Sequence, residues 1–161
     1  MQKNEAMLVT KQGFQAVGLV WSGTLADAEA GGIRAVIATM QERLPEIEHV
    51  LHPDKLLGLS YMNVEGGFTH YAVVEVEQVE RIPAGMRIVT LPTLTYAKCE
   101  HKKGQHIDTS YSNIFAWIEE QGYKLHKGDV DHFEQYPMQQ DPYDADPEFL
   151  IMIPVETPPD V

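Results

Sequence analysis

The chain has 161 residues, 43% of them hydrophobic, which fits one domain that buries a core without disulfides or structural metal. Its formal net charge of -12, from 24 acidic and 12 basic residues, disfavours binding to nucleic acid or anionic membranes and suits a cationic or neutral partner. The single cysteine, Cys99, excludes an internal disulfide, and no segment has the apolar length of a signal peptide or membrane span, so we expect a soluble, cytoplasmic protein.

The N-terminal part of the chain indicates a strand followed by a helix. Residues 14–22 are rich in β-branched and aromatic side chains, which is typical of a strand. Apolar residues then recur at the spacing of one buried helix face over residues 27–44, and Pro45 ends the run. Gly31 and Gly32 leave the start of this helix open.

The middle of the chain indicates strands. Two strand-like runs, 55–62 and 69–77, are separated by a glycine-containing connection that predicts a hairpin. An extended stretch over residues 86–101 follows, and Pro92 predicts a break within it, because a central strand does not tolerate proline.

The C-terminal part indicates a second helix and a strand pair. Apolar residues lie on one helical face over residues 109–121, with Asp108 as the expected N-cap and Gly122 suited to the left-handed position after the helix. The runs 131–137 and 148–155 flank an acidic, proline-containing loop and are expected to pair as strands.

The order strand, helix, strand, strand therefore occurs twice, without a repeated residue motif. We expect an α+β domain spanning residues 1–161, with two pseudo-symmetric units at about 7–82 and 86–155. Both helices should pack on one face of a curved, mostly antiparallel sheet. Residues 156–161 contain two prolines and are expected to form a frayed tail.

Several segments resemble the GyrI-like effector-binding family, whose members occur alone or fused to helix-turn-helix regions in bacterial regulators of drug response. The resemblance covers nearly the whole chain, and its most specific part is the order and spacing of the last three motifs. The segments are VGLVWSG (17–23), YAVVEVEQVERIPAGM (71–86), WIEEQGY (117–123), FEQYP (133–137) and IMIPV (151–155).

This resemblance implies a ligand cavity between the helices and the sheet, with one glutamate inside it. The matching residue is Glu134, and Tyr111, Trp117 and Tyr136 are the candidate aromatic walls. Trp21, near the end of the first predicted strand, is a candidate for lining the symmetric half of the cavity. A lone carboxylate among aromatic rings would favour a cationic ligand.

The residues alone leave an ordinary alternative open. Glu134 could alternate with its neighbours on a solvated strand face while Phe133 fills the core. Tyr111 and Trp117 could equally be plain core residues, as aromatic side chains at helical spacing often are.

Other reactive side chains do not form a recognisable site. Cys99 and His101 share one extended stretch, but nothing brings a catalytic base to the thiol, and a lone strand cysteine is usually a buried hydrophobe. The histidines lack zinc-ligand spacing, and the acidic loop lacks the glycine and ligand spacing of an EF-hand. We expect no metal and no cofactor.

The residues and what the family resemblance implies together leave three classes of function open. The first is a small-molecule binding module for cationic or amphipathic aromatic compounds, in which the DNA-binding region of the family's regulators is absent. The second is a small-molecule hydrolase with the pocket glutamate as general base and a tyrosine as helper. The third is a gyrase-inhibitor-like module that binds a macromolecular partner. Whether the chain is an enzyme is left open.

Overall fold

The computed structural model describes residues 2–157, and four of the six residues of the expected tail, 158–161, lie outside this range. The described part forms one sheet in which every strand pairing is antiparallel, together with helices that cover it. In chain order the elements are β1 (Ala6–Lys11), β2 (Phe14–Thr24), α1 (Leu25–Glu29), α2 (Gly32–Arg43), a 3-10 turn η1 (Leu44–Glu46), β3 (Lys55–Val64), β4 (Gly67–Val76), β5 (Arg87–Leu91), β6 (Leu94–His101), α3 (Ile107–Glu120), β7 (Lys124–Leu125), β8 (His132–Pro137) and β9 (Phe149–Glu156).

The first predicted helix is present but divided. Thr24 caps α1 through a reciprocal pair of hydrogen bonds with Asp27, and the chain then passes through Gly31 at φ 105° before α2 begins. A positive φ of this size is strained for residues with a side chain, so glycine permits the break. The two glycines that left the start of the helix open mark the point where it is divided.

The second predicted helix is confirmed, with one correction at its N-terminus. The N-cap of α3 is His106 and its side chain makes no capping hydrogen bond, whereas Asp108 lies inside the first turn. There the Asp108 carboxylate still faces the positive end of the helix dipole. Gly122 follows the helix at φ 80°, as expected for a left-handed terminal glycine.

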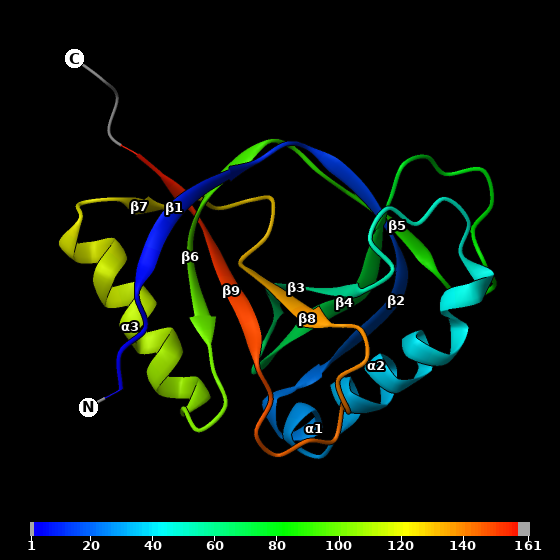
Figure 1. Cartoon of the computed structure of the whole chain (residues 1–161), viewed down its shortest axis with the longest axis horizontal. Helices are drawn as coiled ribbons and strands as arrows, with labels where there is room; N and C mark the ends of the chain where they lie inside the picture. Colours follow the sequence, from blue (N-terminus) through cyan, green and yellow to red (C-terminus); the bar gives the residue numbers. More distant parts are fainter. Residues whose placement is uncertain (1, 158–161) are drawn as a thin grey trace.

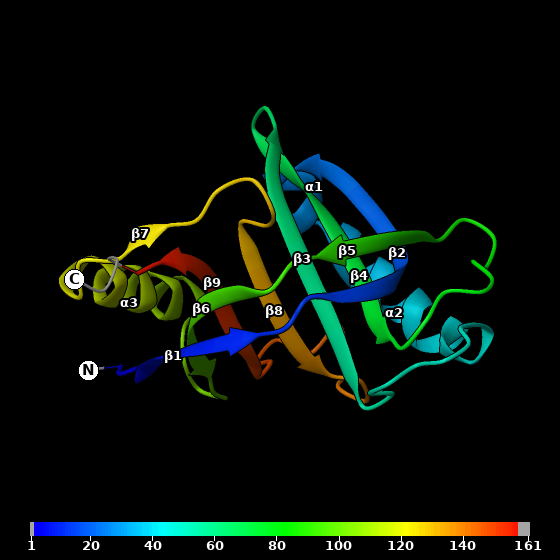
Figure 2. The same cartoon turned by 90° about the horizontal axis from the view of Figure 1, so that it is seen from above.

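The sheet order is β1-β6-β9-β8-β3-β4-β2-β5, with β7 paired to β9. The order is symmetric about the junction between β8 and β3, where the two strand, helix, strand, strand units meet. Each unit is preceded by one further strand, and these two strands, β1 and β5, are exchanged between the units. β1 leads into β2 but pairs with β6, and β5 leads into β6 but pairs with β2. Figures 1 and 2 place α3 and α2 at opposite ends of the molecule with β8 and β3 between them.

Both helices pack on the same face of the sheet, as predicted. Ala72 belongs to the cluster around Met40 of α2, and Ile151 belongs to the cluster around Ile114 of α3. The two residues lie in one row of register partners that runs through Gly58 and Glu134, and register partners point to the same face.

The opposite face holds the remaining large core cluster. It contains residues from both ends of the sheet order, such as Leu91 of β5 and Tyr96 of β6, because the sheet curls until its outer strands approach each other. Figure 1 shows this curl in the arch formed by β1, β6 and β2. Pro92 interrupts the extended stretch between β5 and β6, which confirms the predicted break.

The acidic loop between β8 and β9 is tied to both units. Gln41 of α2 donates its side-chain amide to the carbonyl oxygens of Met138 (2.9 Å) and Gln140 (2.8 Å). The Asp146 carboxylate accepts the backbone N–H of Gly104, which lies in the turn before α3, at 2.8 Å. The loop therefore spans from the helix of one unit to the turn that precedes the helix of the other.

In residues 2–157, no helix is long and apolar enough to cross a membrane.

Candidate ligand-binding site

Glu134 lies on β8 at the junction of the two units. Its register partner on β3 is Gly58, so the carboxylate stands beside a position with no side chain. His132 and Tyr136, two residues before and after Glu134, point to the same helix-covered face as Glu134. Phe133 points to the opposite face and is fully buried.

Two tyrosine hydroxyls bind the Glu134 carboxylate. Tyr136 donates to Oε1 at 2.7 Å, and Tyr111 of α3 donates to Oε2. Burial raises the pKa of Glu134 above its usual value, and the two hydroxyl donors oppose that rise. Burial, together with the nearby carboxylate, raises the pKa of both tyrosines well above 10, so both phenols remain protonated donors. The carboxylate is therefore not the lone, unpartnered group that the resemblance implied.

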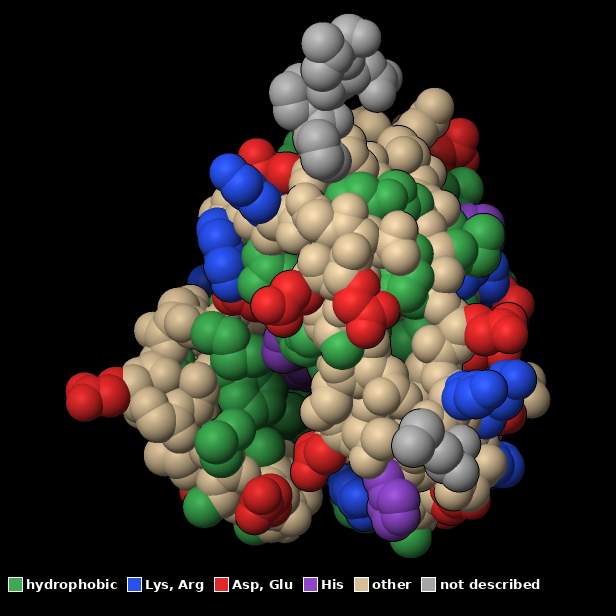
Figure 3. Space-filling view, turned by 90° about the vertical axis from the view of Figure 1, so that its left-hand side faces the viewer, with side chains coloured by type: hydrophobic (Ala, Val, Ile, Leu, Met, Phe, Trp, Pro, Cys, Tyr) green, Lys and Arg blue, Asp and Glu red, His purple; other side chains and the backbone are tan. Residues whose placement is uncertain are grey.

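The three residues line a cavity of about 620 Å³ between the sheet and the helices. Most of its wall is aromatic or aliphatic, and Figure 3 shows a hollow lined by hydrophobic side chains with a histidine in its depth. The side chains are Leu25, Ile33, Ser60, Met62, Phe68, His70, Ile107, Asp108, Tyr111, Ser112, Phe115, His132, Glu134 and Tyr136.

Three large apolar residues mark the mouth of the cavity. Leu25 of α1, Met62 of β3 and Ile107 of α3 line it, yet each keeps 41% or more of its surface exposed. Exposed apolar groups around a concave site are typical of an entrance for organic ligands.

The floor of the cavity carries polar groups that the sequence did not point to. Ser60 of β3 is the register partner of both His132 on β8 and His70 on β4, so the three side chains form a row next to Gly58 and Glu134. Ser60 Oγ lies 3.0 Å from His70 Nδ1 and shares a hydrogen bond with it. Burial lowers the pKa of both histidines, that of His70 to about 4, so both imidazoles are neutral at pH 7.

The two tryptophans proposed as ligand contacts lie outside this lining. Trp117 packs against Tyr123 with ring centroids 5.8 Å apart, within the α3 core cluster. Trp21 packs edge-on against Phe68 at 5.3 Å, and Phe68 does line the cavity. The structure thus brings together Glu134, Tyr136 and Tyr111, and leaves Trp21 and Trp117 out of the cavity lining.

A second, smaller hollow of about 350 Å³ lies beside the cavity and shares Tyr136 with it. Its lining includes charged side chains such as Lys55 and Glu148, and it also includes the buried His101, whereas Glu134 is not part of it. The 620 Å³ cavity is the better candidate because it contains the Glu134 carboxylate.

Cys99 is buried in the α3 cluster, and burial raises the pKa of its thiol to about 11. A thiol of that pKa is a poor nucleophile at neutral pH.

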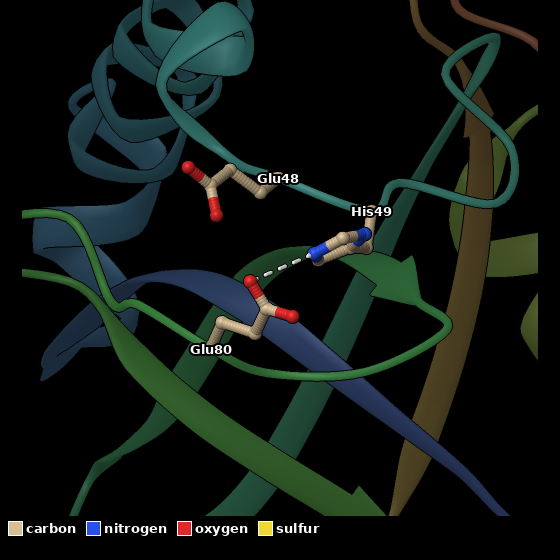
Figure 4. Close-up of side chains that lie close together, drawn as sticks. All are labelled: Glu48, His49 and Glu80. Atoms are coloured by element: carbon tan, nitrogen blue, oxygen red, sulfur yellow. Dashed lines mark ion pairs between the residues drawn. The ribbon is translucent and has the colours of Figure 1, made fainter.

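Within the described residues, one group of three side chains has atoms close enough to hold a metal ion: Glu48, His49 and Glu80 (Figure 4). All three are exposed, and His49 Nε2 already pairs with Glu80 at 3.4 Å. Exposed acidic groups often lie together in this way without an ion, so the expectation of no metal stays a prediction.

The fold and the cavity define an α+β small-molecule binding domain. The family model of the GyrI-like small molecule binding domain matches residues 5–156, and the chain belongs to that family. Comparison with curated proteins finds no match.

Several solved structures share the fold of this chain. SAV2435 bound to tetraphenylphosphonium has a TM-score of 0.70 at 17% identity, with 94% of each chain covered. The EcmrR C-terminal domain has a TM-score of 0.73 at 14% identity, covering 96% of this chain and 99% of that one. A hydrolase from Listeria innocua has a TM-score of 0.60 at 12% identity, covering 97% of this chain and 94% of that one.

Proposed function

We propose that the protein binds small organic cations with aromatic surface, and that Glu134 selects for their positive charge. The observation that carries the proposal is a partly buried carboxylate, held by Tyr111 and Tyr136, inside a mostly apolar cavity. A cation entering the cavity would offset the cost of burying the carboxylate and would stack on the surrounding ring faces.

The ligand of a structural neighbour supports this chemistry. SAV2435 was solved with tetraphenylphosphonium, a cation covered by aromatic rings. We extend the class of ligand, and not that compound itself, to the present chain. The net charge of -12 supports a cationic small molecule over nucleic acid or anionic membrane as the partner, and the single cysteine supports a cytoplasmic location.

Replacing Glu134 with Gln tests the proposal. Methyltriphenylphosphonium and neutral triphenylphosphine oxide have similar shapes, and calorimetric titration of both separates charge from apolar contact. Loss of one partner of a buried charge pair typically costs about 2–5 kcal/mol, so affinity for the cation should fall at least 30-fold. Affinity for the neutral compound should change much less, because burial and stacking hold it.

The control for this test is Glu119→Gln, which makes the same change of charge at an exposed position on α3, outside the cavity lining. It should leave both affinities unchanged. The Glu134→Gln protein should unfold at a similar denaturant concentration, since the amide loses the burial cost of the charge along with its stronger hydrogen bonds. Equal losses of affinity for both compounds would exclude charge selection.

Hydrolysis is the second candidate function. It is favoured by the polar groups beside Glu134, since Ser60, His70 and His132 share its cavity, and by a structural neighbour described as a hydrolase. A glutamate with a raised pKa and a tyrosine beside it are the kind of groups that act in general acid–base catalysis. Mass spectrometry of small esters and amides incubated with the protein would reveal it, and products formed equally by Glu134→Gln would exclude this role.

A further inference from the structure

His70 is a buried polar group in the ligand cavity whose hydrogen bonding is half complete. Its side chain is 2% exposed, and Nδ1 shares a hydrogen bond with Ser60 Oγ. In the described residues, the other ring nitrogen, Nε2, has no hydrogen-bond partner. A buried polar atom without a partner is costly, typically by about 1–3 kcal/mol.

The glycine of the cavity floor shows which way this ring edge is directed. A Cβ placed on Gly58 would lie 2.8 Å from His70 Cε1 and 3.1 Å from Nε2, and 3.5 Å from Cε2 of Tyr136. The Cε1–Nε2 edge therefore leans over Gly58, toward the part of the floor where Gly58 pairs with Glu134. The unpartnered nitrogen is thus on the ring edge next to Gly58, the register partner of Glu134.

The sequence and register hold the imidazole in this position. Ser60 and His70 are register partners on β3 and β4, so their side chains project from the same face at neighbouring positions. The missing side chain at Gly58 leaves room for the ring. The low pKa of the imidazole keeps it neutral at pH 7, so it adds no positive charge that would repel a cation.

We infer that His70, oriented by Ser60, supplies a second polar contact in the ligand cavity. The ligand class is then narrower than aromatic cations in general: an aromatic cation that also carries a hydrogen-bonding group, such as a hydroxyl, at a distance from its charge. Ser60 can donate to Nδ1 or accept from it, so Nε2 is a donor in one tautomer and an acceptor in the other. A hydroxyl satisfies either tautomer. This inference rests on the proposed function.

The test compares tetraphenylphosphonium with its 3-hydroxyphenyl and 4-hydroxyphenyl analogues. At least one analogue should bind the wild type about 3- to 10-fold more tightly than the parent, the gain expected of one net hydrogen bond. In His70→Leu the ratio of analogue affinity to parent affinity should fall to about one, whatever the substitution does to the affinity for the parent compound. If neither analogue gains, or if His70→Leu keeps the gain, the inference is overturned.

The matched control is His101→Leu. His101 is likewise buried (1% exposed), bonds a serine through Nδ1 (Ser110, 2.6 Å) and has an unpartnered Nε2, yet it does not line the 620 Å³ cavity. In His101→Leu the ratio of analogue affinity to parent affinity should equal that of the wild type. A fall of this ratio to about one in His101→Leu as well would overturn the inference. Parent binding that Glu134→Gln does not weaken would instead contradict the proposed function, so the two failures are distinguishable.

A second measurement needs no variant. In protein labelled with ¹⁵N in its histidines, the hydroxylated cation should shift the Nε2 resonance of His70 and leave that of His101 unchanged. The parent cation should shift the His70 resonance less. Equal shifts with both cations would contradict a hydrogen bond to Nε2.

Discussion

Glu134 shows how a charged residue is accommodated in an apolar cavity. Tyr136 reaches the carboxylate from the same strand two residues away, and Tyr111 reaches it from α3, so both oxygens accept a hydrogen bond. Neither donor carries a positive charge. The negative charge is therefore held in place without being neutralised, which is what the proposed selection for cations requires.

His70 gives a prediction for stability against pH. Its pKa is lowered by burial from 6.5 to about 4, so between these values the unfolded chain takes up a proton that the folded chain does not. The free energy of unfolding should therefore fall as the pH is lowered from about 6.5 to about 4, by ~3 kcal/mol from this residue, and should not depend on it above that window. Urea unfolding at pH 7.5, 5.5 and 4.5 measures the slope of the free energy of unfolding against pH.

The variant His70→Leu should reduce this slope, and the exposed His52→Gln should not. A remaining slope is expected, because burial also lowers the pKa of His101 and His132. Glu134 acts in the opposite direction, since its raised pKa favours the folded state at low pH. An unchanged slope in His70→Leu would mean that His70 is not held neutral by the fold.

The sequence led to part of the site and missed the rest for a physical reason. Glu134, Tyr136 and Tyr111 were proposed through the family resemblance, and they meet in the structure. Ser60 and His70 were missed because their role depends on which distant strands pair, and one sequence does not reveal that β3 lies beside β8. The only local signal was a histidine within an apolar strand run.

At the scale of elements, runs with strong patterns were predicted well. The hairpin of β3 and β4, the break at Pro92 and the pairing of β8 with β9 all appear as expected. The strands β1 and β7 were missed, because β1 is an edge strand with a weak pattern and β7 has two residues. Glu156, which was expected to belong to the tail, is part of β9 and pairs with Lys124.

The division between α1 and α2 gives a second prediction. Gly31→Ala should destabilise the protein by about 1–2 kcal/mol, since no atom crowds the position and the cost is the positive φ alone. Chemical denaturation measures it. Gly31→Asn should cost less, because asparagine tolerates left-handed backbone better. Equal stability of Gly31→Ala and the wild type would mean that the division does not depend on glycine.

This division also shapes the cavity. Leu25 lies on α1 and Ile33 on α2, and both line the wall. On one continuous helix the two positions would lie about 12 Å apart along a single axis, whereas the division at Gly31 places them on two separate helices.

At the scale of the whole molecule, the acidic loop connects the two units at their helix ends. Gln41→Ala removes two hydrogen bonds to this loop and should destabilise the protein by roughly 1–3 kcal/mol. Hydrogen exchange should become faster at the Gly104 and Glu148 amides, which the loop binds. The exposed Gln139→Ala is the control, and equal exchange in both variants would show that Gln41 does not hold the loop.

The exchange of β1 and β5 limits how this chain can be divided or shortened. A fragment ending between the two units would keep β1 but lose β6, the strand it pairs with, and would expose β2 where β5 had covered it. The other fragment would keep β5 but lose β2, the strand it pairs with, and would expose β6 where β1 had covered it. Neither half can therefore be inherited, expressed or discarded as a module of its own, even though the element order repeats. Any evolutionary change that keeps the cavity must keep both halves in one chain or supply the missing strand from another molecule.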